Sequence, residues 1–267
     1  AGFYVPSPHN AASVSDTCGA TGSATVTFTA TDACGNSSTT SATFTIIDDT
    51  DPTITTQAAN LEVQCDGAGN TSQLNAWLTS NGGAVASDIC SNVTWTNNFA
   101  SVSDTCGATG SVSVTFTATD NCGNSSSTTA TFTIIDNTNP TITTQASNLE
   151  VQCDGNGNTA ALNAWLASNG GASATDVCSS VTWSNNFTSV SDTCGATGSA
   201  SVTFTATDNC GNSSSTTATF TIIDNTNPTI TTQASNLEVQ CDGAGNTAAL
   251  NAWLASNGGA AATDVCS

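Results

Sequence analysis

A sequence period of 88 residues is the feature that most constrains how this chain can fold. The segment SVSDTCGATGS begins at Ser13 and recurs twice, each time 88 residues further on. The segment NLEVQCDG begins at Asn60 and recurs at the same interval. A period of this length indicates a series of similar modules. Each module is a small domain with a modest core, so cross-links would add usefully to its stability.

Short runs of alternating apolar and polar residues within one period predict β-strands. In the longest run, the alternation from Ala200 to Ala206 would turn every second side chain toward the interior. Several such runs separated by turns are typical of a β-sandwich. In the period from Pro140 to Asn227 we expect strands at 141–144, 149–153, 181–183, 189–192, 199–208 and 216–223.

One segment of each period predicts a short helix; in the period 140–227 it is NTAALNAWLASNGG, residues 158–171. Leu162, Trp165 and Leu166 form one apolar stripe that would pack on the core. We expect Asn158 or Thr159 to cap the start of the helix and the Gly-Gly pair to end it. The predicted fold is therefore all-β, with tandem immunoglobulin-like β-sandwich modules that each contain one short inserted α-helix.

The charge composition excludes several classes of function. The chain has no Lys or Arg, 20 acidic residues and a formal charge of −20. Binding to nucleic acid or to an anionic lipid surface depends on basic side chains, so neither partner is expected. No run of 18 apolar residues is present for membrane insertion. The repeated unit has no His, Lys, Arg or Tyr from which a catalytic site could be built, so we expect no enzyme activity.

Twelve cysteines recur at four positions of the period, starting with Cys18, Cys34, Cys65 and Cys90. An even and regular set in small modules predicts a disulfide framework and an extracellular, oxidising compartment. Zinc is the competing interpretation. It is disfavoured because the chain has no CxxC pair and its single histidine, His9, lies outside the repeat.

Several sequence segments of the repeat resemble those of a known family. TATDNCGNSSSTTATFTI resembles the end of a hyalin-repeat (HYR)-like domain, which is an immunoglobulin-like sandwich. Together with LEVQCDG, LNAWL and ATDVC, it is similar to repeats in large secreted surface proteins and adhesins of bacteria. The resemblance covers all but about the first eleven residues. It implies an adhesive or stalk function at the cell surface and no catalysis. The predicted helix departs from the HYR pattern, which has a strand there.

An immunoglobulin-like layout also guides the pairing of the cysteines. Neighbours such as Cys106 and Cys122 would stand at opposite ends of a strand, roughly 35 Å apart. A disulfide requires Cα atoms within about 7 Å, so neighbouring pairs are not expected. The layout instead brings the first strand's end near the Gly107–Gly110 turn. We therefore expect the pairs Cys65–Cys106, Cys90–Cys122, Cys153–Cys194 and Cys178–Cys210.

The phase of the repeat divides the chain into two complete modules and two halves. Residues 1–51 are expected to be the C-terminal half of a module and 228–267 the N-terminal half, with complete modules at 52–139 and 140–227. The halves are complementary, which predicts a head-to-tail homopolymer that grows as an open filament. Within each completed module we expect the intermolecular disulfides Cys18–Cys241 and Cys34–Cys266.

A second interpretation stays open at this stage. The chain is then a window of a longer cell-surface adhesin, and its modules bind surface glycans or other surfaces. Near-identical modules favour spacing and mechanical continuity, because binding proteins usually place specificity in variable loops. Weak multivalent binding by identical modules remains compatible with the sequence.

Acidic residues gather where one module is expected to meet the next. Carboxylates with nearby backbone oxygens are the ligands that Ca²⁺ takes, and an ion here would stiffen the joint. The alternative interpretation is that these residues make turns and cap strand ends. The candidate calcium ligands are Asp48, Asp49, Asp51, Asp88 and Asp120; no other cofactor is expected.

Three asparagines lie in N-S-S sequons, at Asn36, Asn124 and Asn212. They are candidate glycosylation sites if the host modifies asparagine.

Overall fold

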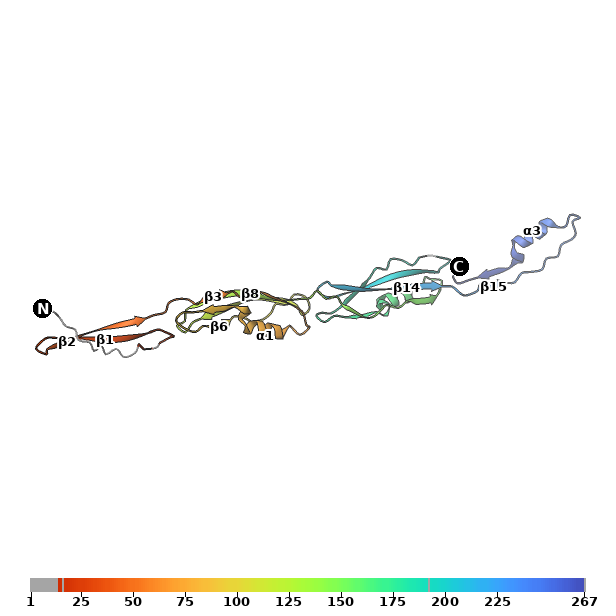
Figure 1. The fold of residues 1–267 in the computed structure, drawn as a ribbon. Coiled ribbons are helices and arrows are strands. Elements are labelled where there is room, and N and C mark those ends of the chain that lie inside the picture. The colour runs from red at the N-terminus through yellow and green to blue at the C-terminus, as the bar shows by residue number, and fades with distance from the viewer. Residues whose placement is uncertain (1–13, 16, 192, 267) are drawn as a thin grey trace. The chain divides into compact units, whose positions relative to one another are not determined.

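The computed structural model describes residues 14–15, 17–191 and 193–266 (Figure 1). The chain separates into two compact units, 1–136 and 137–267. This boundary falls within the linker expected before Pro140. The finer division into two modules and two halves stays a prediction, and the elements below are given unit by unit.

Unit 1 contains a long hairpin followed by a complete set of module strands. Its elements are β1 (Gly22–Thr31), β2 (Ser37–Ile46), β3 (Thr53–Thr56), β4 (Leu61–Gln64), α1 (Thr71–Thr79), a 3₁₀ turn (Asn81–Gly83), β5 (Val85–Ser87), β6 (Thr94–Asn97), β7 (Gly110–Thr119) and β8 (Ser125–Ile135).

Unit 2 repeats the complete set and then begins it again. Its elements are β9 (Thr141–Thr144), β10 (Leu149–Gln152), α2 (Thr159–Ala167), a 3₁₀ turn (Asn169–Gly171), β11 (Ser173–Thr175), β12 (Thr182–Asn185), β13 (Gly198–Thr207), β14 (Ser213–Ile223), β15 (Thr229–Thr232), α3 (Thr247–Ala255), a 3₁₀ turn (Asn257–Gly259) and β16 (Ala261–Thr263).

Each complete module is built from a four-stranded and a two-stranded sheet. In unit 1 the larger sheet has the order β4-β8-β7-β6, and β3 pairs with β5. The pairing of β4 with β8 is parallel, whereas the other pairings are antiparallel. Unit 2 repeats this with β10-β14-β13-β12 and β9 with β11. The predicted fold class, an all-β sandwich module with one short helix, is confirmed.

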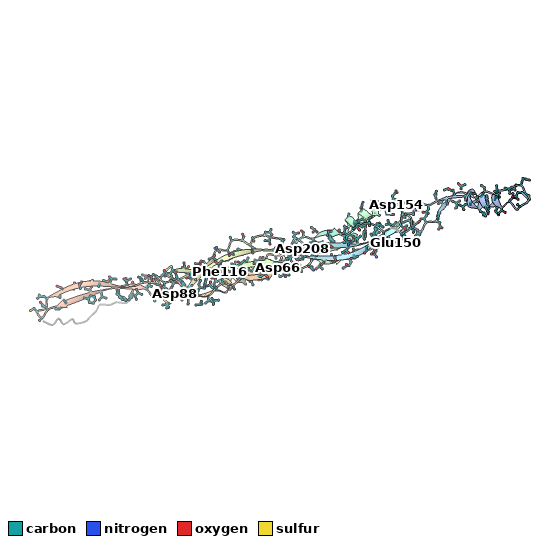
Figure 2. The ribbon with its side chains drawn as sticks, turned by 90° about the horizontal axis from the view of Figure 1, so that it is seen from above. Asp66, Asp88, Phe116, Glu150, Asp154 and Asp208 are labelled. Atoms are coloured by element: carbon teal, nitrogen blue, oxygen red, sulfur yellow. A yellow bond between two sulfur atoms is a disulfide. The ribbon has the colours of Figure 1, made fainter. Side chains whose placement is uncertain are left out.

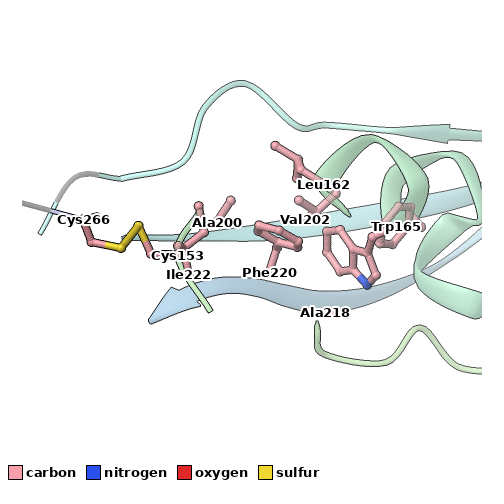
Figure 3. Close-up of a cluster of buried hydrophobic side chains, with 10 residues drawn as sticks. Cys153, Leu162, Trp165, Ala200, Val202, Ala218, Phe220, Ile222 and Cys266 are labelled. Atoms are coloured by element: carbon pink, nitrogen blue, oxygen red, sulfur yellow. A yellow bond between two sulfur atoms is a disulfide. The ribbon is translucent and has the colours of Figure 1, made fainter. Parts of the chain in front are cut away.

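The core of each module lies between the helix and the long strands. In unit 2, Val202, Phe204 and Phe220 have no exposed surface (Figure 3). The ring of Trp165 meets the Phe204 ring edge-on with centroids 5.2 Å apart. The Trp165 indole N–H also donates to the Ser147 carbonyl at 3.0 Å. The predicted apolar helix stripe and the inward alternation of β13 are therefore correct, because both periodicities match the faces that are buried.

The helix begins after Asn158, one of the two expected cap residues, but without the expected capping hydrogen bond. Asn158 is the N-cap residue, but it has a left-handed backbone (φ 52°) and its side chain makes no capping hydrogen bond. Its amide oxygen instead accepts from the Asp154 N–H at 3.2 Å, and its amide nitrogen donates to the Gln152 carbonyl at 2.8 Å. Asparagine tolerates the left-handed region, so it both turns the chain and ties the β10–α2 loop together.

The strand expected at 189–192 is not formed by the described residues of that segment. Ser191 nevertheless lies beside Ser199, and its N–H donates to the Ser199 carbonyl at 2.8 Å. This segment is held to the edge of β13 by isolated hydrogen bonds rather than by a continuous ladder. Residue 192 lies outside the described residues.

Candidate assembly surfaces and disulfide network

Two disulfides each join a cysteine of one period to a cysteine of the next. Cys18 bonds to Cys122 in unit 1, with Cα atoms 5.1 Å apart and 104 residues between them in sequence. Cys153 bonds to Cys266 in unit 2, with Cα atoms 6.1 Å apart and a separation of 113 residues (Figure 3). Both bonds are therefore longer in sequence than the 88-residue period.

Backbone contacts accompany these bonds. In unit 2 the Ala196 N–H donates to the Cys266 carbonyl at 2.8 Å, and in unit 1 the Ala20 N–H donates to the Cys90 carbonyl at 2.8 Å. A Cβ atom added to Gly155, whose φ is 76°, would lie 2.7 Å from the Val265 carbonyl oxygen. Glycine is required at this position both for its backbone conformation and for the close approach of the Val265 loop.

Four of the predicted disulfides are wrong. Cys122 bonds to Cys18 instead of Cys90, and Cys153 bonds to Cys266 instead of Cys194. The same two bonds exclude the predicted intermolecular pairs Cys18–Cys241 and Cys34–Cys266. The physical reason is that the loop ending in Cys266 docks on the turn at Ala196 and brings its own sulfur to Cys153, so the neighbouring period supplies the partner.

The other two predicted pairs are Cys65–Cys106 and Cys178–Cys210. All four of these cysteines are disulfide-bonded. These two pairs were expected from the same layout, in which both cysteines of a bond belong to one module. Neither of the two bonds described above joins cysteines of one module.

The four cysteines left as thiols among the described residues are Cys34, Cys90, Cys194 and Cys241. Cys90 is half-buried and the other three are exposed. Desolvation, followed by the negative charges of Asp48, Asp88 and Asp120, raises the pKa of the Cys90 thiol. A raised pKa keeps this sulfur protonated and lowers its reactivity as a nucleophile.

The β1–β2 hairpin exposes apolar side chains that are buried in the complete modules. Phe28 and Phe44 are 46% and 63% exposed, whereas their repeat counterparts in unit 1, Phe116 and Phe132, are fully buried. The strand register is the same in both places, because Phe28 pairs with Thr40 as Phe116 pairs with Thr128. The hairpin is therefore correctly folded but has no helix packed on its apolar face within the described residues.

The segment around α3 also exposes apolar side chains that are covered in the complete modules. Leu250 and Leu254 are 49% and 56% exposed, whereas Leu162, the counterpart of Leu250, is buried. A hollow of about 460 Å³ lies beside the helix. It is lined by Asn236, Leu237, Val239, Gly245, Asn246, Ala249, Leu250 and Trp253. Phenylalanine rings fill the equivalent space against Trp77 and Trp165 in the complete modules.

The local structure around α3 is nevertheless preserved. The Trp253 indole N–H donates to the Ser235 carbonyl at 2.9 Å, as Trp165 does to Ser147. The Asn246 amide donates to the Gln240 carbonyl at 2.7 Å, as the Asn158 amide does to the Gln152 carbonyl. The hollow therefore lies beside a segment with the same local structure as in the complete modules.

The sequence LEVQ forms a strand only where a partner is present. Leu61–Gln64 pairs in parallel with Phe132–Ile135, and Leu149–Gln152 pairs in the same way with Phe220–Ile223. Residues 237–240 have the identical sequence but form no strand. The repeat counterpart of the missing partner is Phe44–Ile47, in the β1–β2 hairpin.

The expected calcium ligands are partly brought together. Ligand atoms of Asp48, Asp88 and Cys90 lie within 4.8 Å of one another. The Asp48 Oδ2 atom is buried and has no hydrogen-bond partner among the described residues. Asp48, Asp51 and Asp88 line one surface hollow. The Asp51 Oδ1 atom accepts a hydrogen bond from the Ser125 N–H at 3.2 Å. Calcium binding itself stays a prediction.

Two of the expected ligands have other surroundings. The Asp120 Oδ1 atom accepts N–H groups from residues 122, 123 and 124, and Oδ2 accepts from the Asn124 amide at 2.7 Å. Asp120 thus closes its own turn, as the alternative interpretation expects. Asp49 is exposed and is not among the residues that line the hollow at Asp48. In Figure 2, Asp66 and Asp88 lie on either side of Phe116, so the acidic residues of this module do not form one cluster.

The sequon asparagines use their amide nitrogens in turns. Asn36 donates to Asp32 Oδ2 at 2.9 Å, Asn124 to Asp120 Oδ2 at 2.7 Å and Asn212 to Asp208 Oδ2 at 2.8 Å. Attachment of a glycan at this nitrogen would disturb the turn hydrogen bond. Glycosylation at these positions stays a prediction.

None of the known family models matches the sequence, and no curated protein matches it. Among solved structures, a protocadherin gammaB7 EC3-6 cis-dimer is 15% identical over 80% of this chain and 61% of that chain, with a TM-score of 0.30. Titin domains I67–I69 are 10% identical over 76% and 75%, with a TM-score of 0.32. Drosophila N-cadherin EC1-4 is 11% identical over 78% and 59%, with a TM-score of 0.27.

This chain spans about three fifths of the protocadherin structure. No helix in the described part of the chain is long and apolar enough to cross a membrane. The disulfides are typical of proteins from oxidising, extracellular compartments. The structure is thus one of tandem immunoglobulin-like modules that are linked by disulfides across successive periods.

Proposed function

We propose that this chain is the structural subunit of an extracellular bacterial filament or surface stalk. Subunits join head to tail, because the N-terminal half-module of one copy completes the C-terminal half-module of the preceding copy. The partner is a second copy of the chain. The resemblance of the sequence to HYR-like repeats of bacterial surface proteins supports placement at the cell surface.

The observation that carries this proposal is the match between the two exposed apolar faces. In a complete module the Trp77 ring lies 5.2 Å from Phe116 and 5.6 Å from Phe132, measured between centroids. Trp253 has the same helix and the same indole hydrogen bond, but the hollow beside it is empty of phenylalanine. Phe28 and Phe44 of the next copy are the residues that the repeat assigns to this space.

Strand addition supports the same joint. Residues 237–240 of one copy would pair in parallel with Phe44–Ile47 of the next, in the register that Leu61–Gln64 and Phe132–Ile135 show. The backbone groups of an unpaired edge are then satisfied, which is a recurrent mode of protein association.

The expected stabilisation is large enough for association. Full burial of one phenylalanine or leucine side chain contributes about 1.5–3 kcal/mol. Phe28, Phe44 and Leu250 are all about half exposed before assembly and would become buried, as their repeat counterparts in the complete modules are. Because the two faces are different surfaces of the same chain, a row of joined copies still has one unused face at each of its two ends. Such a heterologous contact propagates as an open filament.

The test is assembly of the purified chain, followed by light scattering and electron microscopy over a range of concentrations. We expect fibres from the unmodified chain and loss of fibres in the double variant Phe28→Ser/Phe44→Ser. Thr29→Ala is the matched control on the opposite face of β1 and should assemble normally. An unchanged melting temperature of the complete modules shows that the variants fold.

Two results would overturn the proposal. The first is an unmodified chain that stays monomeric at all concentrations, as expected if the faces are covered by further repeats of a longer adhesin. The second is normal fibre formation by the double variant.

A further inference from the structure

We propose that each joint between copies is sealed by two disulfides, Cys194 of one copy with Cys34 of the next and Cys241 of one copy with Cys90 of the next. This inference rests on the proposed head-to-tail assembly. It replaces the intermolecular pairs expected from the sequence, which the observed bonds exclude.

The first pair follows from the register of the Cys18–Cys122 bond. Cys34 and Cys194 are the repeat counterparts of Cys122 and Cys18, respectively. If a second copy continues the repeat, each of its positions is counted three periods, or 264 residues, further along. Its Cys34 then stands 104 residues beyond Cys194, which is the separation of the observed bond.

The second pair follows from the Cys153–Cys266 bond in the same way. Cys241 and Cys90 are the repeat counterparts of Cys153 and Cys266. In the displaced copy Cys90 stands 113 residues beyond Cys241, which is again the observed separation. The four thiols therefore form two complementary pairs, with none left over.

The thiols of the first pair are already held in the conformation of their bonded counterparts. The Cys34 N–H donates to Asp32 Oδ1 at 2.9 Å, and the Cys122 N–H donates to Asp120 Oδ1 at 2.8 Å. The Cys194 turn is closed by a hydrogen bond from the Thr197 hydroxyl to the Cys194 carbonyl at 2.7 Å. Thr21 makes the same bond to Cys18 at the same distance.

The thiols of the second pair are held in the same way. The Cys90 N–H donates to Asp88 Oδ1 at 2.8 Å, and the Cys266 N–H donates to Asp264 Oδ1 at 2.7 Å. The loop after Cys241 is tied by the Asn246 N–H to Asp242 Oδ1 at 3.0 Å. The loop after Cys153 has the matching bond, also at 3.0 Å. Bond formation thus requires little rearrangement of either loop.

The space around Cys241 also fits an incoming loop. Gly155, near Cys153, is closely approached by the Val265 carbonyl, whereas a Cβ atom at the counterpart Gly243 would meet nothing within 4 Å. Cys153 and Cys266 are buried by their contact, whereas Cys241 is exposed. The loop that the next copy would place there contains Cys90.

Each sealing step is a two-electron oxidation that needs a disulfide oxidant, such as oxidised glutathione or the disulfide form of a thiol oxidoreductase. The Cys241 thiolate attacks the oxidant and forms a mixed disulfide, and one thiol leaves. The Cys90 thiolate then attacks the Cys241 sulfur and releases the second thiol. The two cysteines lose two protons and two electrons, and the oxidant is reduced to two thiols. Cys34 and Cys194 react in the same way.

This pairing has a mechanical consequence. Neither bond joins the two halves of the completed module to each other. Cys241 lies in one half and reaches the complete module of the next copy, and Cys34 lies in the other half and reaches back to the complete module of the preceding copy. Each joint is then cross-linked like the contacts between successive periods within one chain.

The test is peptide mapping of fibres that are assembled with oxidised glutathione and then treated with iodoacetamide. Pepsin at low pH is suitable, because the chain has no Lys or Arg for trypsin and acid prevents disulfide exchange. Sequence differences identify each cysteine: Ala33 precedes Cys34, and Ile89 precedes Cys90. The peptide of Cys194 is identified by Ala200 and Ser201, and the peptide of Cys241 by Ala244 and Ala248. We expect linked peptides containing Cys34 with Cys194 and Cys90 with Cys241. Any other intermolecular pair, or alkylated thiols at all four positions, overturns the inference.

Variants separate this inference from the proposed function. Cys34→Ser and Cys90→Ser should each keep a multimer ladder on non-reducing SDS gels, because one bond per joint remains. The double variant should run as a monomer in SDS but still form fibres under native conditions. A persistent ladder in the double variant overturns the disulfide assignment alone. Absence of fibres from the unmodified chain overturns the proposed function and this inference together.

Discussion

Phe28 and Phe116 occupy the same position of the repeat and the same place in the strand register, yet Phe28 is 46% exposed and Phe116 is fully buried. The difference is the helix: Trp77 packs edge-on against Phe116, and no helix covers Phe28 within the described residues. The same side chain is thus a core residue in the complete module and an exposed residue in the β1–β2 hairpin.

This difference predicts unequal effects of the same substitution. Phe116→Ala should lower the free energy of unfolding by about 3–5 kcal/mol, because it leaves a cavity in a packed core. Phe28→Ala should change it by less than about 1 kcal/mol in the unassembled chain, since the side chain is already half exposed. Urea unfolding at concentrations below assembly measures both. Equal losses for the two variants would show that the hairpin face is covered in the single chain.

Asn70 is expected to be essential for the β4–α1 loop. It is fully buried with φ 50°, its amide donates to the Gln64 carbonyl at 2.9 Å, and its oxygen accepts from the Asp66 N–H at 3.2 Å. Asn70→Ala should cost about 2–4 kcal/mol, because the Gln64 carbonyl and the Asp66 N–H lose their partner and alanine tolerates the left-handed backbone region less well than asparagine. The exposed Asn75 supplies the control: Asn75→Ala should stay within about 0.5 kcal/mol. Thermal unfolding distinguishes the two.

The reactivity of Cys90 should depend on Asp48. Desolvation and then the Asp48 charge raise the pKa of the thiol, so the thiolate fraction near neutral pH is low. Asp48→Asn removes that charge but keeps an oxygen that can accept the Thr50 N–H. The rate of Cys90 alkylation by iodoacetamide at pH 7.5 should rise several-fold, on the order of 2–5 times. Mass spectrometry of the Cys90 peptide gives the rate, and an unchanged rate would contradict the electrostatic explanation.

Acid should destabilise the modules through the aspartates that follow the LEVQ strands. Backbone hydrogen bonds, chiefly from Asn70 to Asp66 and from Asn158 to Asp154, lower the pKa of these carboxyls. A lowered folded-state pKa means that the stabilisation is present above the unfolded value of about 4 and is lost as the pH falls through the folded value. The melting temperature should therefore vary little from about pH 5 to 7 and fall below about pH 4. Asp154→Asn should weaken this acid dependence, and a melting temperature that is flat down to pH 3 would contradict it.

Calcium is expected to act at the Asp48–Asp88 cluster. Ca²⁺ takes several oxygen ligands, and the buried Asp48 Oδ2 atom offers one without a hydrogen-bond partner among the described residues. Millimolar Ca²⁺ should raise the melting temperature of the chain by a few degrees, since an ion that binds only the folded state stabilises it. The double variant Asp48→Asn/Asp88→Asn should lose this response. Identical calorimetric traces with calcium and with EGTA would show that the cluster binds no ion.

Much of the module follows from local periodicity. The alternation along Ala200–Ala206 and the stripe of Leu162 and Trp165 each match the face that is buried, because the period of side chains along a strand or helix is a property of the backbone alone. The left-handed backbone of Asn158 is not evident from its sequence, since asparagine serves both as a helix cap and in the left-handed region.

The cysteine pairing shows where sequence reasoning stops. All four cysteine positions recur with the same period, so bonds within a module and bonds between successive periods have equally regular spacing. No signal in the sequence distinguishes them. The choice depends on which loops meet, and the hydrogen bond from Ala196 to the Cys266 carbonyl shows that a loop of the next period docks on the turn of the preceding one.

The amino-acid sequence by itself therefore determined the 88-residue module with its strands and helix, since these depend on patterns within one period. Only the tertiary structure decided which apolar side chains are exposed and which sulfurs meet. Disulfide bonding depends on contacts between segments that lie more than one period apart, as the 104 and 113 residues that separate the bonded cysteines show. Burial depends on whether a helix packs on a long strand, as Trp77 packs on Phe116.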